Sequence, residues 1–103
     1  MAPFVKVAKT SDVPAGEIQA FEVAHTKVVI CHTSDGFYAL ENECSHDGAP
    51  IDDGELCGHD IICSRHGAKF DVKNGEVTGP PAVVGIDQYE LKIEGDNIYV
   101  LVN

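Results

Sequence analysis

Short runs of alternating apolar and polar residues, separated by turn residues, make up most of this chain. No stretch of ten or more residues carries apolar side chains at the 3.6-residue period of an amphipathic helix. Alternating runs bounded by Gly, Pro, Asn, Asp or Ser are typical of short β-strands. The pattern therefore predicts an all-β domain with about nine or ten short strands, which is enough for two packed sheets.

Two of the expected strands have clear burial patterns. Residues 27–33 are apolar on both faces, so this strand should be central in its sheet. In residues 88–94, the alternation predicts that Tyr89, Leu91 and Ile93 face the core. The full set of predicted strands is 4–8, 17–24, 27–33, 37–41, 60–63, 68–72, 76–78, 88–94 and 98–102.

Turn residues separate these strands. Residues 10–16 are expected to form a turn, with one turn of helix capped by Ser11 or Asp12. Asn74-Gly75 is a type I′ hairpin signal. The other predicted turns are a hairpin at 34–36, an acidic turn at 52–55 that lacks the ligand spacing of a calcium loop, and a turn at 95–97.

Length and charge narrow the classes of function. The 103 residues are expected to form a single domain. The formal net charge of −10 argues against a nucleic-acid or anionic-membrane partner, and it suits either docking to a basic protein face or simple solubility. No apolar run approaches the roughly 18 residues of a membrane span, and the first residues lack a signal-peptide core. We therefore expect a soluble, cytoplasmic protein.

The residues with the clearest chemistry occur in two matching segments. Cys44-Ser45-His46 is followed, after sixteen residues, by Cys63-Ser64-Arg65-His66. Each segment offers one thiol and one imidazole beside a glycine. A zinc ion accepts any tetrahedral mixture of these ligands, whereas a two-iron, two-sulfide cluster with two Cys on one iron and two His on the other fits one of each per segment.

On these residues the chain resembles the Rieske iron–sulfur proteins, whose signature is Cys-x-His, a spacer of similar length, then Cys-x-x-His. The resemblance covers nearly the whole chain and is to the soluble Rieske-type ferredoxins. It implies that Cys44 and Cys63 bind the inner iron of one [2Fe-2S] cluster, and that His46 and His66 bind the outer, more exposed iron. A zinc site formed by two Cys and two His is the alternative.

The same resemblance implies an antiparallel β-sandwich with an inserted, smaller cluster-binding subdomain, approximately residues 42–82. Pro80-Pro81, which cannot continue a strand because proline lacks an N–H donor, would form a third wall against the cluster. An ordinary linker between hairpins is the alternative reading of this segment.

The resemblance also bears on the redox potential, which spans roughly −150 to +300 mV in Rieske centres. High-potential members carry a loop-bridging disulfide at the positions of Ala49 and Arg65, and hydroxyl donors at the positions of Ala68 and Phe70. Here these groups are absent. Because hydrogen bonds to sulfur favour the reduced cluster, we expect a low potential with little pH dependence near neutrality. The Arg65 charge acts in the opposite direction, or is only an exposed loop charge.

The remaining cysteines and histidines give weaker signals. Cys31 lies in an apolar run and should be a buried, reduced thiol, and Cys57 could be similar. A disulfide between them would be unusual in a reducing cytoplasm. His25, His32 and His59 have no second ligand at metal spacing, so they are expected to be structural or surface residues.

Together these features predict an electron carrier rather than an enzyme. The chain has no nucleophile–base pair, phosphate loop or two-His, one-carboxylate iron site. By resemblance, it would take electrons from a flavin-dependent reductase, pass them to a terminal ring-hydroxylating oxygenase, and be a monomer when free. The alternatives are a small Rieske subunit of a nitrite reductase-like complex and a zinc-stabilised β interaction module.

Overall fold

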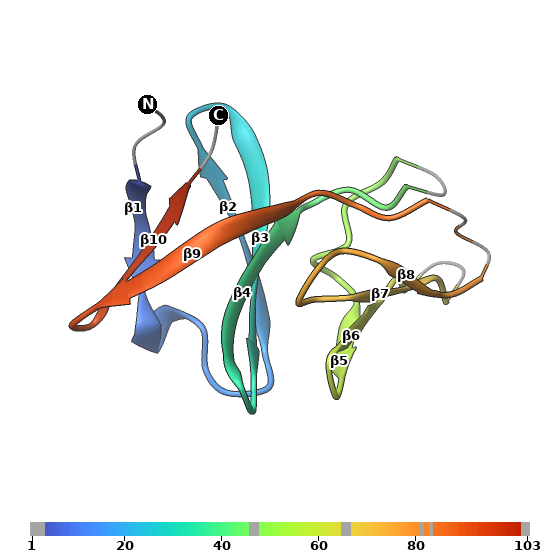
Figure 1. Cartoon of the computed structure of the whole chain (residues 1–103), viewed down its shortest axis with the longest axis horizontal. Coiled ribbons are helices and arrows are strands. Elements are labelled where there is room, and N and C mark those ends of the chain that lie inside the picture. Colours follow the sequence, from blue (N-terminus) through green and yellow to red (C-terminus); the bar gives the residue numbers. More distant parts are fainter. Residues whose placement is uncertain (1–3, 46–47, 65–66, 81, 83, 102–103) are drawn as a thin grey trace.

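The computed structural model describes residues 4–45, 48–64, 67–80, 82 and 84–101. Within these residues it contains strands and one short 3₁₀ helix, η1 (Figure 1). The elements are β1 (Phe4–Lys9), η1 (Thr10–Asp12), β2 (Ile18–Val23), β3 (Thr26–Thr33), β4 (Gly36–Glu41), β5 (Glu55–Cys57), β6 (Asp60–Ile62), β7 (Lys69–Asp71), β8 (Val77–Gly79), β9 (Gln88–Glu94) and β10 (Asn97–Leu101).

The strands form two antiparallel sheets. The larger sheet has six strands in the order β1-β10-β9-β4-β3-β2, and the smaller one has four in the order β5-β6-β7-β8. All four strands of the smaller sheet lie in the chain between β4 and β9, which pair with each other through Ala39 and Tyr89. The chain therefore leaves the larger sheet, builds the smaller one beside it and returns to the same place (Figure 1).

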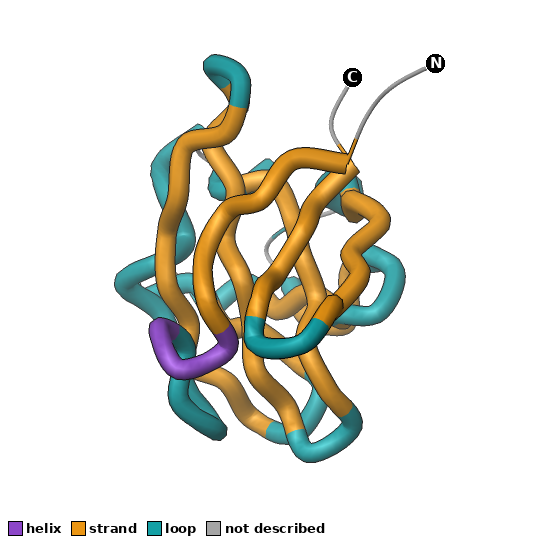
Figure 2. Tube along the Cα trace, turned by 90° about the vertical axis from the view of Figure 1, so that its left-hand side faces the viewer, coloured by secondary structure: helices purple, strands orange, loops and turns teal. Residues whose placement is uncertain are grey.

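Strand β3 separates two buried clusters. Alternate side chains point to opposite faces of a strand, so Val29 and Cys31 lie on one side while Val28 and Ile30 lie on the other. All four are 0% exposed, and β3 lies between β4 and β2, so the prediction that it is not an edge strand is confirmed. In Figure 2 the strands of the larger sheet face the viewer, with η1 in the connection between β1 and β2.

We name these clusters by their position. The inter-sheet core comprises Val29, Cys31, Leu40, Cys44, Ile51, Ile61, Cys63, Ala68, Phe70, Val72, Ala82 and Ile86. The inner core of the larger sheet comprises Ala8, Val13, Val23, Val28, Ile30, Ala39, Ile98 and Val100. Both cysteines of the predicted metal site belong to the inter-sheet core.

The predicted all-β architecture is confirmed, with differences in single elements. Strand β5 was not predicted, because its first residue, Glu55, was assigned to the acidic turn at 52–55; its Leu56 pairs with Ile61 of β6. Ile93 was predicted to face the core and is 40% exposed. It pairs with Ile98 close to the β9–β10 turn, at the end of the strand pair.

The turn and cap predictions were partly wrong. A type I′ turn needs positive φ at both central residues, and of Asn74 and Gly75 only Gly75 has it, at 77°. Instead, Ala24 and His25 have φ of 50° and 67° in the two-residue turn between β2 and β3. Helix η1 is capped by Lys9, whose N–H donates to the Asp12 carboxylate at 2.9 Å. Ser11 and Asp12 are therefore inside the helix rather than at its cap.

The cysteines outside the predicted site differ from each other. Cys31 is a free thiol that is 0% exposed, as predicted. Cys57 is also a free thiol, but it is exposed on the edge strand β5, so its predicted similarity to Cys31 was wrong. In the described part of the chain, no helix has the length and apolar character needed to cross a membrane.

Candidate metal centre

The first ligand loop begins at Cys44, just after β4. The backbone N–H of Cys44 donates to the carbonyl oxygen of Ala49 at 2.8 Å, and the N–H of Gly48 donates to the carbonyl oxygen of Cys44 at 2.7 Å. Gly48 has a φ of 74°, which glycine adopts without steric cost. These two bonds join Cys44 to Gly48 and Ala49, so the two ends of the turn are held together.

The second ligand loop repeats this geometry. The N–H of Cys63 donates to the carbonyl oxygen of Ala68 at 2.8 Å, and the N–H of Gly67 donates to that of Cys63 at 3.0 Å. Gly67 has a φ of 75°. The sequence explains the match, since both loops read Cys-Ser-x-x-Gly-Ala. The structure thus has two equivalent turns, and each starts with a cysteine.

The two turns are held close together by the segment that follows the first one. A Cβ atom placed on Gly54 would lie 2.0 Å from the carbonyl oxygen of Ile62, so only glycine permits this approach. Ile62 immediately precedes Cys63. The chain leaving the first loop therefore packs directly against the chain entering the second.

Both cysteine side chains are buried in the inter-sheet core. Cys44 is 0% exposed and Cys63 is 2% exposed, and Ile51, Ala68 and Phe70 belong to the same cluster. Thiolates buried among apolar side chains are stable when a metal or another cation compensates their charge. Two buried thiols, on two equivalent turns that each carry one histidine, are a donor set that fits a two-iron cluster.

The predicted histidine ligands lie outside the described residues. These are His46, the third residue of the first loop, and His66, the fourth residue of the second. Arg65 and Pro81 also lie outside them. The structure therefore places the two predicted cysteine ligands in one buried cluster, and the ligand set as a whole stays a prediction.

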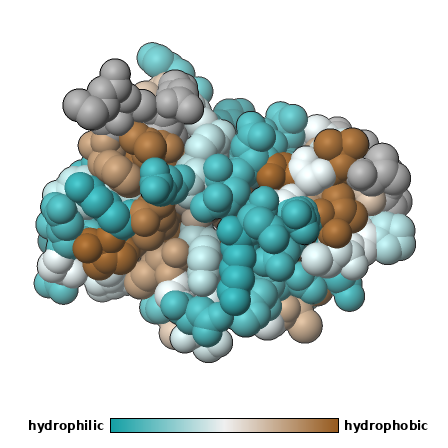
Figure 3. Space-filling model, viewed as in Figure 1, coloured by the Kyte–Doolittle hydropathy of each residue, from teal (hydrophilic) through white to brown (hydrophobic). Residues whose placement is uncertain are grey.

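The segment after β8 is hydrogen-bonded to the first loop and to the β7–β8 turn, and the third wall at Pro80-Pro81 stays a prediction. The Ser45 hydroxyl donates a hydrogen bond to the carbonyl oxygen of Val84. The N–H of Ile86 donates to the carbonyl oxygen of Gly75 at 2.8 Å, which fixes the end of the segment to the β7–β8 turn. Ala82 is buried in the inter-sheet core, whereas Val84 is 64% exposed. Figure 3 shows apolar surface at this end of the molecule, on the right, as well as over the larger sheet on the left.

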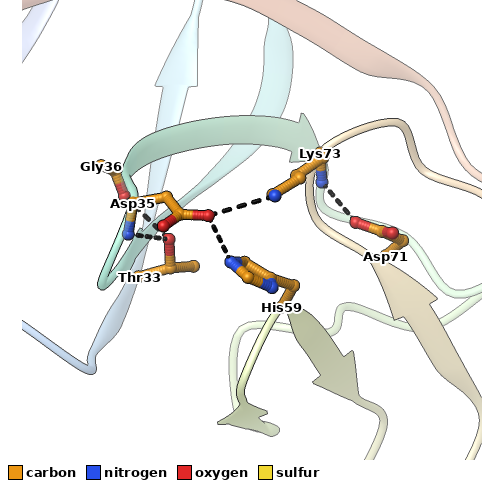
Figure 4. Close-up of polar contacts among 6 residues, drawn as sticks. All are labelled: Thr33, Asp35, Gly36, His59, Asp71 and Lys73. Atoms are coloured by element: carbon orange, nitrogen blue, oxygen red, sulfur yellow. Dashed lines mark hydrogen bonds and ion pairs between the residues drawn. The ribbon is translucent and has the colours of Figure 1, made fainter.

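Sequence reasoning missed two polar features, one beside the first loop and one at the end of the smaller sheet opposite to the second loop. The first is Asn42, whose side chain makes three hydrogen bonds beside the first loop. The second is a bridge between the sheets, in which Asp35 accepts from His59 and Lys73 (Figure 4). The hydrogen bond from Lys73, followed by that from His59, lowers the pKa of Asp35. Neither feature has a local sequence signal, because the partners are far apart along the chain.

The chain is similar to several known proteins. It matches the family described as Rieske [2Fe-2S] domain over residues 3–90. It is 30% identical to the ferredoxin component of biphenyl 2,3-dioxygenase from Rhodococcus jostii, over 92% of this chain and 89% of the relative. A solved structure, the ferredoxin of carbazole 1,9a-dioxygenase from Nocardioides aromaticivorans, is 31% identical with a TM-score of 0.94, over 99% and 100% of the two chains.

A second solved structure adds a partner to this comparison. It is described as the complex of reduced oxygenase and oxidized ferredoxin in carbazole 1,9a-dioxygenase. Its matching chain is 30% identical with a TM-score of 0.87, over 95% of this chain and 92% of that one.

Proposed function

Because this chain belongs to the Rieske [2Fe-2S] domain family, we propose that it is the ferredoxin component of a ring-hydroxylating oxygenase system. It is an electron carrier with one [2Fe-2S] cluster, and not itself a catalytic enzyme. The Rieske-type fold expected from the sequence is confirmed by the structural likeness. The observation that carries the proposal is the pair of equivalent turns that place Cys44 and Cys63 in one buried cluster.

The proposed ligands are Cys44 and Cys63 for the inner iron and His46 and His66 for the outer iron. The cluster supplies the chemistry of the protein, the reversible uptake of one electron. The chain's own residues hold and shield it: the two turns orient the thiols, and Ile51, Ala68 and Phe70 exclude water from their side of the site. We further propose that residues 42–82 act as the cluster-binding subdomain of a single domain.

The partners in this proposal are a flavin-dependent reductase as electron donor and a terminal oxygenase as acceptor. The reported complex of an oxygenase with a ferredoxin similar to this chain supports the acceptor. The net charge of −10 favours basic docking faces on both partners, with binding that weakens as salt rises. We propose that the protein works in the cytoplasm and is monomeric when it is not docked.

The direct test is an analysis of iron and acid-labile sulfide in the purified protein. We expect two iron and two sulfide ions per chain, the content of one [2Fe-2S] cluster. Cys44→Ser, Cys63→Ser, His46→Ala and His66→Ala should each lose the normal cluster and its visible absorption. Cys57→Ser is the matched control, because this thiol is exposed and outside the inter-sheet core.

Two results would contradict the proposal. One metal ion without inorganic sulfide would indicate a zinc-stabilised module instead. A normal cluster spectrum in His66→Ala would show that the ligand assignment is wrong. Electron transfer is checked by mixing the reduced protein with a ring-hydroxylating oxygenase and measuring the rate of cluster reoxidation at low and high salt.

A further inference from the structure

The side chain of Asn42 closes the first ligand loop from outside. Its Oδ1 accepts hydrogen bonds from the N–H groups of Ile51 at 2.8 Å and Asp52 at 3.1 Å. Its Nδ2 donates to the Asp52 carboxylate at 3.1 Å. Asn42 precedes Cys44 by two residues, and Ile51 follows Ala49 by two. One side chain therefore joins the two ends of the loop.

The second ligand loop has a different closure. It connects β6 directly to β7, and Ile62 and Lys69 on either side of it are paired in the sheet. The first loop has no such ladder among the described residues, because β4 ends at Glu41 and β5 begins only at Glu55. The two turns have the same backbone hydrogen bonds but different closures. Paired strands close the second loop, and the Asn42 side chain closes the first.

Asn42 is itself anchored at both sides. Its backbone N–H donates to the carbonyl oxygen of Lys27 on β3 at 3.0 Å, which ties it to the larger sheet. Its partner Ile51 is 0% exposed and lies in the inter-sheet core with Cys44. Asn42 therefore links β3, through its backbone, to the far end of the first loop, through its side-chain amide.

The chemistry of this position requires a side chain that both accepts and donates. Alanine would leave the N–H groups of Ile51 and Asp52 without their acceptor, at a cost typical of unsatisfied partly buried donors. Aspartate would keep the acceptor, but it would place a second carboxylate against Asp52, which is 3.1 Å from the Asn42 amide nitrogen. The Asn42 amide satisfies all three bonds while Asp52 is present.

We propose that Asn42 is a positioning residue for the metal centre, which holds the two ends of the loop that begins at Cys44 together. This rests on the proposed function. The positioning role predicts that closure of the first ligand loop depends on the Asn42 side chain, whereas closure of the second loop does not depend on a single side chain. Residues that orient metal ligands typically change metal affinity or activity by about 10- to 100-fold when they are mutated.

The test measures how fast iron passes from the purified, cluster-loaded protein to a chelator, together with the electron paramagnetic resonance spectrum of the reduced cluster. In N42A we expect release about 10- to 100-fold faster than in wild type, and altered g-values in the clusters that remain. N42D should also release iron faster. The double variant N42D/D52N should recover the wild-type rate and spectrum, because the new carboxylate can accept the same two N–H groups while the new amide donates back to it.

The matched control is N74A. Asn74 Oδ1 also accepts a backbone N–H, from Glu76 at 2.9 Å, but it lies in the β7–β8 turn outside both ligand loops. We expect this variant to release iron at the wild-type rate with an unchanged spectrum. If N74A behaved like N42A, the effect would be general to the fold and the proposal would be overturned.

Two other results would overturn the positioning role. N42A could keep the wild-type rate and g-values, or the N42D/D52N swap could release iron as fast as N42D. Wild-type protein that contained no iron and sulfide would instead reject the proposed function itself, so the two failures are distinguishable.

Discussion

The Oδ2 atom of Asp35 lies 2.6 Å from Nε2 of His59, and this contact joins the larger sheet to the smaller one (Figure 4). Asp35 sits in the β3–β4 turn and His59 in the β5–β6 turn. The same oxygen lies 3.1 Å from Nζ of Lys73, in the β7–β8 turn. The backbone carbonyl of His59 also accepts from the N–H of Val72 at 2.8 Å. One carboxylate therefore links three turns that come from both sheets.

This bridge predicts a pH dependence of stability. The pKa of Asp35 is lowered from 3.8. The contribution of Asp35 to the free energy of unfolding is therefore complete above pH 3.8, and it is lost as the pH falls through the lowered pKa. The pKa of Lys73 is raised from 10.5, mainly by the hydrogen bond to Asp35, so its contribution is complete below pH 10.5 and is lost as the pH rises through the raised pKa.

We therefore expect Asp35→Asn to lower the free energy of unfolding at neutral pH, by a small amount because all three side chains are exposed. Urea denaturation of wild type and variant at neutral pH and well below pH 3.8 checks this. The difference should shrink in acid and in high salt. A difference that stays constant across both conditions would show that the charge of Asp35 is not its cause.

The two cysteines outside the metal centre should differ in reactivity. Burial raises the pKa of the Cys31 thiol to about 12, so very little thiolate is present at neutral pH. Cys57 is exposed. In cluster-loaded protein, iodoacetamide should modify Cys57 and leave Cys31 unmodified, as measured by mass spectrometry of the digested protein. Cys57→Ser should abolish the rapid labelling, whereas labelling of Cys31 at the rate of Cys57 would contradict the prediction.

The β2–β3 turn offers a stabilising substitution. Ala24 and His25 both have positive φ, which costs residues with a Cβ roughly 1–2 kcal/mol each. Asn-Gly is the preferred pair for this type I′ geometry. Replacing Ala24-His25 by Asn-Gly should raise the stability by about 1 kcal/mol, or the midpoint of thermal unfolding by about 4–8 °C. The control is Asn-Gly placed at exposed Gln19-Ala20 inside β2, which should destabilise the fold.

The redox potential is predicted to be low, and one added hydroxyl should raise it. Ala68 is 0% exposed and shares the inter-sheet core with Cys44 and Cys63. A serine there that donates to sulfur would favour the reduced state by about 1 kcal/mol, which corresponds to about 40 mV. Protein-film voltammetry of wild type and Ala68→Ser measures both values.

The control for this shift is Ala39→Ser. Ala39 is equally buried but lies in the inner core of the larger sheet, away from the ligand loops. Its midpoint should equal that of wild type. A wild-type midpoint well above zero would show that the low-potential expectation is wrong, and an unchanged midpoint in Ala68→Ser would show that the new hydroxyl does not reach sulfur.

The sequence by itself determined the strands and the chemistry of the loops. Alternation in runs such as 27–33 and 88–94 is a property of neighbouring residues, so it predicts strands without knowledge of their partners. The repeated Cys-Ser-x-x-Gly-Ala segments likewise carry their ligands and their turn glycines within six residues. For this reason the all-β fold followed from local patterns, and the same local patterns predict the ligands of the cluster.

Only the tertiary structure decided the features that join distant segments. Asn42 reaches Ile51 and Asp52, and Asp35 reaches His59 and Lys73, across turns whose positions depend on how the two sheets pack. Ile93 carries a core-like pattern but is exposed, because burial depends on what lies opposite a strand rather than on the strand itself. Local sequence determines which face of a strand a side chain lies on, whereas packing between segments determines which residues it contacts and how far it is buried.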